Sequence, residues 1–349
     1  EDFFEPQMDF VFQGEGVTAF RSILRGLEDG RTAPSAPGVW TRQESEFVFG
    51  GPPPPFEVDA LPVPDRSLSP ADRPHYFINW MRPLALARTS VGCPYSCNFC
   101  SLWKIMEHIY HMRDIPSVVE ELATIDEEFI MLVDDEAFIN GKRMVKLAEA
   151  IKASGIRHRY FTYCRIDTLI RQPEVLTLWR EIGLERLFIG VEAVTDEDLL
   201  AFNKKLNVNQ VDTGLRLARE LGINVFANFI VKPTYTEKDF RQLAKFIQMR
   251  EDVIDYPSFT IWTPIPGTDL LDSTFSGVIE RQPNGRPNWA LFDCQNAVTR
   301  MALPKGEFIR QYFNLWQLFG SHANAANSPE RTAGAFGAHA RGPVPVPTL

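Results

Sequence analysis

Six apolar segments that alternate with amphipathic helical patterns constrain the fold of this chain more than any other feature. Three of the helical patterns end in glycine, at Gly155, Gly183 and Gly222, where a left-handed cap is typical. Near-continuous apolar strands separated by helices indicate a parallel sheet that is covered by helices. Six such units predict an α/β fold, a partial (β/α)6 barrel of the TIM type. The predicted strands span residues 84–91, 128–135, 160–167, 186–193, 224–231 and 257–265.

Polar residues follow these strands at the rim of the predicted barrel, where a barrel of this kind gathers its functional groups. The first strand leads directly into a loop with three cysteines. Because the carboxyl ends of parallel strands share one rim, polar side chains from successive strands should converge on that loop. The candidates are Cys93, Cys97, Cys100, Asp134, Asp135, Glu136, Arg165, Asp167, Glu192 and the turn at residues 264–267.

Composition and charge exclude several classes of protein. The 349 residues are 44% hydrophobic and 23% charged, as in ordinary globular proteins. No apolar run approaches the roughly 20 residues of a membrane span. A formal charge of -9 argues against nucleic acid as a partner. Five cysteines, three of them clustered, do not resemble a secreted disulfide framework, so we expect a cytoplasmic location.

Cys93, Cys97 and Cys100 have the spacing C-x3-C-x2-C, and three interpretations of them compete. They could be unligated core cysteines, but a loop with proline and polar neighbours makes a poor core. They could bind zinc with His108 or His111 as the fourth ligand, although structural zinc sites usually combine two separated pairs. They could hold an iron–sulfur cluster through three thiolates, which leaves one iron open, as a catalytic site requires. The position directly after the first barrel strand favours the cluster.

The motif, with Phe99 before its last cysteine, resembles that of the radical S-adenosylmethionine superfamily over residues 83–285. The resemblance implies a 4Fe–4S cluster held by Cys93, Cys97 and Cys100. It also implies that S-adenosylmethionine chelates the fourth iron through its amino and carboxylate groups, and that reduction yields a 5′-deoxyadenosyl radical. The cosubstrate would then fill the place that a fourth cysteine would take.

Two acidic segments resemble elements with which the superfamily binds S-adenosylmethionine. The stretch "LVDDEAF" implies that Asp134, Asp135 or Glu136 contacts the methionine amino group. Glu192 in "IGVEA" would accept hydrogen bonds from the ribose, since a carboxylate offers two acceptors to a vicinal diol. The alternative for the first three carboxylates is that they cap the helix that follows.

Three further residues complete the predicted S-adenosylmethionine site. Arg165 in "CRID" would pair with the methionine carboxylate or with another nearby acid. Ile265 lies in "TPIPGT", which resembles a segment that packs on adenine, although a rigid turn explains the same residues. Phe99, between two of the cysteines, is the third.

The N-terminal part resembles the end of a cobalamin-binding domain. Residues 9–29 predict a short buried strand, a glycine turn and an amphipathic helix, and Gly14, Glu15 and Gly16 match the "GEGE"-type loop of that domain. Most of such a domain is absent, so we expect a fragment. The predicted division is a domain end at 1–30, an extended Pro-rich linker at 31–82, the barrel at 83–285, a helical extension at 286–320 and a disordered tail at 321–349.

Within the cobalamin-dependent branch, stretches such as "CNFCSLWKIMEHIYHMRD" and "QPNGRPNWALFDCQNAV" most resemble hopanoid C-3 methylases. This implies a methyltransferase that acts on an unactivated carbon of a lipid, with a 4Fe–4S cluster, S-adenosylmethionine and cobalamin as cofactors. Such a carbon has no acidic proton and no leaving group, so acid–base catalysis has nothing to act on. The implied partners are a small hydrophobic, hopanoid-like substrate and an electron donor such as flavodoxin or ferredoxin, without nucleic acid. Contact with the inner face of the membrane is an open alternative.

Other functions stay open beside this one. An oxidative cyclase of chlorophyll synthesis, or a C-methylase of another natural product, would share the cluster and barrel motifs. A methylthiotransferase acting on transfer RNA would carry a second set of three cysteines and a basic C-terminal module, and neither is visible in the sequence. A non-catalytic scaffold would bind zinc without sulfide.

Overall fold

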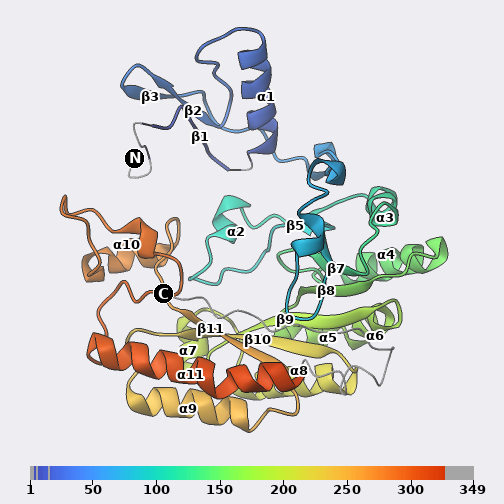
Figure 1. Cartoon of the computed structure of the whole chain (residues 1–349), viewed down its shortest axis with the longest axis vertical. Coiled ribbons are helices and arrows are strands. Elements are labelled where there is room, and N and C mark those ends of the chain that lie inside the picture. The colour runs from blue at the N-terminus through green and yellow to red at the C-terminus, as the bar shows by residue number, and fades with distance from the viewer. Residues whose placement is uncertain (1–3, 5–6, 15, 327–349) are drawn as a thin grey trace.

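The computed structural model describes residues 4, 7–14 and 16–326, and its centre is a sheet of six strands (Figure 1). The strands lie in the order β11-β10-β9-β8-β7-β4, and every neighbouring pair is parallel. This confirms the predicted partial barrel. The strands are β4 (Leu84–Ala87), β7 (Phe129–Leu132), β8 (Arg159–Tyr163), β9 (Leu184–Glu192), β10 (Asn224–Val231) and β11 (Tyr256–Ile261).

Helices cover the outer face of this sheet. The strand residues on that face are fully buried, as Leu187, Ile189 and Val191 show in β9. Trp179 is the largest fully buried side chain, and its Nε1 donates to the carbonyl of Met144 at 2.9 Å. The helices of the barrel are α3 (Ile115–Ala123), α4 (Gly141–Ser154), α5 (Ile166–Arg171), α6 (Pro173–Glu181), α7 (Asp196–Ala201), α8 (Val208–Glu220), α9 (Glu237–Gln248) and α11 (Lys305–Ala326), with the short α2 (Leu102–Ile105) and α10 (Asp269–Thr274) on loops.

The three glycines predicted to end helices have positive φ. Gly155, Gly183 and Gly222 lie at φ 73°, 115° and 68°, in a region that side chains with a Cβ rarely adopt. At Gly183 a Cβ would also lie 2.1 Å from the carbonyl oxygen of His158, so the close approach of two strands requires glycine there.

The prediction of a single strand over residues 84–91 was wrong after Ala87. The chain leaves the parallel ladder there and hydrogen-bonds the carboxylate of Asp134 instead. The next residues form β5 (Ser90–Val91), which pairs antiparallel with β6 (His111–Met112). The cysteine loop therefore begins and ends in a small ladder of two antiparallel strands, β5 and β6.

The N-terminal part folds as a small unit with three antiparallel strands and one helix, α1 (Val17–Glu28) (Figure 1). The predicted strand and helix are present, but the prediction of an extended linker was wrong for residues 39–49. They form a hairpin that pairs with β1, because Val39 and Thr41 face inward while Trp40 between them and Arg42 after them stay more open. The strands are β1 (Phe10–Phe12), β2 (Val39–Gln43) and β3 (Glu46–Phe49).

The amphipathic helix α1 buries only part of its apolar surface. Ile23 is 1% exposed and packs with Val39 in the core of the small unit. The rest of the apolar face predicted for this helix is exposed: Val17, Phe20, Leu24 and Leu27. We call these four residues the open face of α1.

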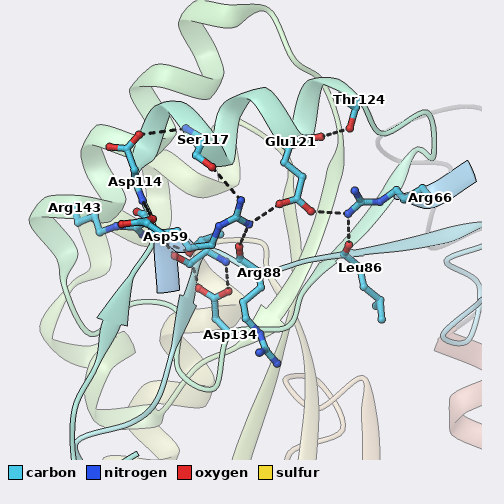
Figure 2. Close-up of polar contacts among 12 residues, drawn as sticks. Asp59, Arg66, Leu86, Arg88, Asp114, Ser117, Glu121, Thr124, Asp134 and Arg143 are labelled. Carbon is cyan, nitrogen blue, oxygen red and sulfur yellow. Dashed lines mark hydrogen bonds and ion pairs between the residues drawn. The ribbon is translucent and has the colours of Figure 1, made fainter. Parts of the chain in front are cut away.

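The second half of the predicted linker, residues 57–76, is bound to the barrel and is named the strap. It contains the 3-10 helices η1 (Val58–Ala60), η2 (Arg66–Leu68) and η3 (Arg73–His75). In Figure 2, Arg66 donates to the Leu86 carbonyl of edge strand β4 at 2.8 Å and to the buried carboxylate of Glu121 at 2.7 Å. Arg113 binds the other oxygen of the same carboxylate at 2.5 Å. The strap therefore covers one edge of the sheet.

The C-terminal helix α11 packs on β11, where the Tyr312 hydroxyl donates to the Phe259 carbonyl at 2.9 Å. It follows the 3-10 helices η4 (Phe275–Gly277) and η5 (Trp289–Leu291) and continues to Ala326, so the prediction of a disordered tail was wrong for residues 321–326. Residues 327–349 lie outside the described part of the chain. Over the residues that are described, no helix has the length and apolar character needed to cross a membrane.

Candidate active site at the cysteine loop

The three cysteines lie on the loop between β5 and β6, above the carboxyl end of the sheet. Cys97 is 7% exposed, while Cys93 and Cys100 are half-buried. The carbonyl of Cys97 accepts hydrogen bonds from the backbone N–H of Cys100 at 3.1 Å and from Nε1 of Trp103 at 2.9 Å. Gly92 begins the loop at φ 95°, where a Cβ would lie 2.2 Å from the carbonyl of Ile109. The loop backbone is thus fixed by its own contacts.

Burial sets the protonation of two of these thiols. It raises the pKa of Cys93 to about 11 and also raises the pKa of Cys100. Free thiols in this setting stay protonated near neutrality, whereas a coordinated thiol loses its proton to the metal. Three soft sulfur donors on one short loop fit an iron–sulfur cluster.

Among the described residues, no three His, Cys, Asp or Glu side chains lie together as ligands of a single metal ion. A 4Fe–4S cluster binds each cysteine through a different iron, so it does not require three side chains to meet at one point. The zinc interpretation, with His108 or His111, would require that convergence.

Arg165 joins the cysteine loop to the barrel. Its Nη1 lies 3.4 Å from Sγ of Cys97, its Nε donates to Asp167 at 2.8 Å, and its guanidinium carbon lies 3.8 Å from the ring centre of Tyr95. Burial lowers the pKa of Arg165, but the charges of Asp167 and Cys97 outweigh burial and raise it. Arg165 is a permanent cation beside the central cysteine, as its place after β8 predicted.

The three acidic residues after β7 have different environments. Asp134 is fully buried and accepts three hydrogen bonds of 2.6 Å from Thr89 and Ser90. These bonds give Asp134 a structural role, because they fix the chain that follows β4. Asp135 accepts from the backbone N–H of Gly92 at 2.8 Å, at the start of the cysteine loop.

Glu136 keeps one carboxylate oxygen free among the described residues. Its Oε2 accepts from the backbone N–H of Arg165 at 2.6 Å, while Oε1 is buried without a hydrogen-bond partner. Burial raises the pKa of Glu136 to about 7. Of the three predicted carboxylates, Glu136 best fits an ammonium group, because a cationic donor would satisfy the unpaired oxygen.

Glu192 lies at the end of β9 and is paired with a residue that sequence reasoning missed. Its Oε1 binds Nζ of Lys204 at 2.8 Å, and both side chains are almost fully buried. Lys204 had no signal in the sequence, because a lysine in the polar stretch "FNKKLN" reads as a solvated residue.

The segment before Lys204 also packs on the cysteine loop. Asn203 Nδ2 donates to the Ser96 carbonyl at 2.7 Å, and Asn98 Nδ2 donates to the Ala201 carbonyl at 2.6 Å. Phe99 packs edge-on against Phe202 with ring centres 5.5 Å apart. The structure therefore gives Phe99 a packing contact within this interface.

The turn after β11 also reaches the cysteine loop. A Cβ on Gly267 would lie 3.7 Å from Cβ of Ser101, the residue after Cys100. Thr268 donates through Oγ1 to the carbonyl of Ile265 at 2.7 Å, so the segment is a rigid turn. Its rigidity and its predicted contact with adenine are compatible.

The predicted cobalamin-side residues are not part of this cluster. Gly14, at φ 76°, follows β1, and Gly16 precedes the first turn of α1, so both belong to the N-terminal unit. Glu15 lies outside the described residues.

The inner face of the sheet carries a row of aromatic side chains that remain half-buried. Tyr163, Phe188, Phe226 and Tyr256 occupy matching positions on β8, β9, β10 and β11, with successive ring centres 4.9, 5.0 and 4.6 Å apart. The interior of a closed barrel is normally filled by side chains. In this sheet the outer face is closed and the inner face keeps exposed surface. We call these four residues the aromatic row.

Comparison with protein families decides the assignment. Residues 88–247 match the radical SAM superfamily. This part of the chain is a radical SAM domain. A 4Fe–4S cluster and S-adenosylmethionine are accordingly the cofactors of the domain, as the cysteine spacing and its resemblance predicted.

Similarity to individual proteins points to one branch of the superfamily. The chain is 33% identical over 306 residues to hopanoid C-3 methylase from Methylococcus capsulatus, covering 87% of this chain and 56% of that protein. It is 29% identical over 281 residues to anaerobic magnesium-protoporphyrin IX monomethyl ester cyclase from Cereibacter sphaeroides, covering 76% and 44%. The chain thus spans about half the length of the curated relatives it matches.

A solved structure shares the fold. The radical S-adenosylmethionine methyltransferase TsrM from Kitasatospora setae, with cobalamin and a [4Fe-4S] cluster bound, superposes with a TM-score of 0.64 at 16% identity. The match covers 89% of this chain and 68% of TsrM. It extends to most of the chain, beyond the segment of the family match.

Proposed function

We propose that this chain is part of a cobalamin-dependent radical SAM methyltransferase that methylates an unactivated carbon of a hopanoid-like lipid. The observation that carries the proposal is the aromatic row, which begins at Tyr163, the last residue of β8, and crosses the inner face of the sheet to Tyr256, the first residue of β11. Tyr163 of that row stands two residues before Arg165, which contacts Cys97. An apolar ring system needs such a wall, because dispersion and surface burial bind it without polar partners.

Residues already described offer candidate ligands for the cluster and for S-adenosylmethionine. Cys93, Cys97 and Cys100 would hold the cluster, Glu136 would bind the methionine amino group, and Glu192 would bind the ribose. When bound, the cluster, S-adenosylmethionine and cobalamin would supply one-electron cleavage of the sulfonium, removal of hydrogen from carbon, and the methyl group.

The protein's own residues would orient and shield these groups. Arg165 holds a positive charge 3.4 Å from Sγ of Cys97, beside the thiol that would bind the cluster. The buried surroundings of Cys97 and Glu136 keep water away from the reacting centre. The aromatic row would fix the lipid ring by contact area alone.

Cobalamin enters through the N-terminal unit. The solved structure of TsrM, which holds cobalamin, matches 89% of this chain and supports cobalamin as a cofactor here. The open face of α1 leaves apolar surface available to the rest of such a domain. A flavodoxin or ferredoxin as electron donor, a cytoplasmic location and contact with a membrane surface belong to the same proposal.

An oxidative cyclase is the second candidate, supported by the 29% identity to the Cereibacter sphaeroides enzyme. A flat macrocycle would also pack on the aromatic row. Products distinguish the two functions, since a methylase adds a carbon to the substrate and a cyclase closes a ring without adding one.

The first test concerns the cluster. Anaerobically reconstituted protein should contain about four irons and four sulfides per chain, and should release 5′-deoxyadenosine from S-adenosylmethionine under a strong reductant. Cys97→Ala should lose both properties. Zinc in place of iron, or equal deoxyadenosine release by the variant, would remove the basis for the proposal.

The second test concerns the substrate. With added methylcobalamin and a hopanoid, mass spectrometry should detect a product heavier by one methyl group. Phe226→Ala in the aromatic row should reduce kcat/KM for the lipid about 10-fold or more, because it removes apolar contact area. Its deoxyadenosine release should persist. Phe313→Ala, at a residue that is 47% exposed on α11, is the control; equal loss in both variants would argue against a lipid site on the row.

A further inference from the structure

We propose that Lys204 is a positioning residue that fixes the orientation of Glu192 and links this carboxylate to the cysteine loop. The ligand of Glu192 is taken to be the ribose of S-adenosylmethionine, so the inference rests on the proposed function in that respect. Nothing in the sequence motifs pointed to Lys204; the inference comes from its contacts.

The first observation is the burial of the pair. Lys204 is 4% exposed and Glu192 is 6% exposed, and Nζ lies 2.8 Å from Oε1. Two charges removed from water in this way persist only when they are paired with each other. Apolar residues of similar size would stabilise a core at least as well, so an ion pair at the barrel rim indicates a role beyond stability.

The second observation is the backbone that presents Glu192. Its φ is 67°, in the left-handed region that favours glycine, and the ladder between β9 and β10 shifts its register at this point. A bulge of this kind turns a side chain away from its regular direction. A Cβ on Gly190 would lie 2.1 Å from Oε1 of Glu192 and 3.1 Å from Nζ of Lys204. Backbone conformation, a glycine and a lysine therefore all determine where this carboxylate points.

The third observation is that the ion pair leaves one oxygen of Glu192 able to accept a further hydrogen bond. Oε2 of Glu192 has a contact with Nδ2 of Asn228 at 3.5 Å, which is the outer limit of a hydrogen bond. Lys204 thus holds one oxygen in place and leaves the other able to accept. A vicinal diol donates two hydrogen bonds and matches a carboxylate fixed in this way.

The fourth observation ties the same lysine to the cysteines. The backbone carbonyl of Lys204 accepts from Nη2 of Arg165 at 3.0 Å, and Nη1 of Arg165 lies 3.4 Å from Sγ of Cys97. The preceding residue, Asn203, binds the carbonyl of Ser96 on the cysteine loop. The segment that contains Lys204 therefore contacts both the cysteine loop and the carboxylate of Glu192, so a change in one can shift the other.

Binding measurements that need no turnover test the proposal. Anaerobically reconstituted protein is titrated with S-adenosylhomocysteine and with its 2′-deoxy analogue. Lys204→Met should weaken S-adenosylhomocysteine binding about 10-fold to 100-fold, the loss typical of removing a group that orients a ligand. It should also abolish the preference for the ribose form. Lys204→Arg should restore part of both, and Lys205→Met, at the exposed neighbouring lysine, should behave as wild type.

A second variant keeps the test decisive if an unpaired Glu192 unfolds the site. The double variant K204M/E192Q carries a neutral amide that needs no ionic partner. It should fold, bind both nucleosides weakly and show no preference between them. An unchanged affinity and preference in Lys204→Met and in the double variant would overturn the inference. Retained discrimination together with an absence of methylated lipid would instead overturn the proposed function.

Discussion

Glu136 shows how one buried carboxylate makes stability depend on pH. Burial raises its pKa from an ordinary value of 4.5 to about 7 in the folded protein. Between these two values the folded state holds a proton that the unfolded chain releases. Folding stability should therefore fall as the pH rises from about 4.5 to 7, by roughly 3 kcal/mol for this group alone.

Replacement of this carboxylate tests the assignment. In protein without cofactors, Glu136→Gln should remove this share of the stability loss between pH 5 and pH 8, as measured by urea unfolding at each pH. Glu181→Gln, at an exposed residue of α6, is the control and should keep the wild-type pH profile. If the pH profile of Glu136→Gln also matched that of wild type, the raised pKa would be wrong.

At the level of single residues, the sequence predicted positions better than roles. Cys97, Arg165 and Glu192 were expected at strand ends or the loop between them, and hydrogen bonds connect all three through the Lys204 segment. Asp134 was expected as a ligand candidate but is fully engaged by Thr89 and Ser90. A motif specifies which residue stands at a strand end, whereas its partners depend on neighbours distant in sequence.

Among the elements, the strap is bound to the barrel in part through the buried carboxylate of Glu121. Glu121 is 2% exposed and binds both Arg66, as Figure 2 shows, and Arg113. Glu121→Gln removes the charge while keeping the shape, and it leaves two guanidiniums without their anion. We expect a loss of about 3–5 kcal/mol in the free energy of unfolding, the cost typical of breaking a buried ion pair.

Urea unfolding and limited proteolysis of the strap measure this effect. The exposed pair between Lys152 and Glu181, 3.2 Å apart, supplies a matched control. Glu181→Gln should change stability by less than about 1 kcal/mol, since exposed pairs contribute little. Similar losses in the two variants would show that the strap is not held by Glu121.

The strap also shows what local patterns cannot reveal. Prolines made residues 31–82 read as an extended connector. The contacts that bind the strap join Arg66 to Glu121 and Arg73 to Glu127, residues more than fifty positions apart. Such pairs leave no periodic signal, whereas the barrel helices were predicted because each carries its own apolar stripe.

On the scale of the whole molecule, helix α1 has one face that is buried in the N-terminal unit and another apolar face that is exposed. Ile23 is 1% exposed and Leu24 is 43% exposed. Ile23→Ala should cost about 2–5 kcal/mol, because it leaves a cavity in the small core. Leu24→Ala should stay within about 0.5 kcal/mol of wild type. Hydrogen exchange of the α1 backbone amides measures the stability of the N-terminal unit separately from that of the barrel. Equal protection in both variants would contradict the packing described for this helix.

The order of the sheet could be predicted for the whole barrel, since parallel strands joined by helices follow one another along the chain. The arrangement of the N-terminal unit could not, because its hairpin is short and its strands do not alternate with helices. The segments that contact the two edge strands, β4 and β11, could not be predicted either, because they are loops without a periodic pattern.

Both edges of the open sheet have their hydrogen bonds taken by non-strand segments. On β4 the Leu84 N–H donates to the Tyr76 carbonyl and the Leu86 carbonyl accepts from Arg66; on β11 the Ile261 N–H donates to the Cys294 carbonyl. An unclosed barrel would otherwise present two templates for the strand of another molecule. The sheet can therefore stay unclosed while these contacts hinder the pairing of its edge strands with another molecule, a pairing that would lead to aggregation.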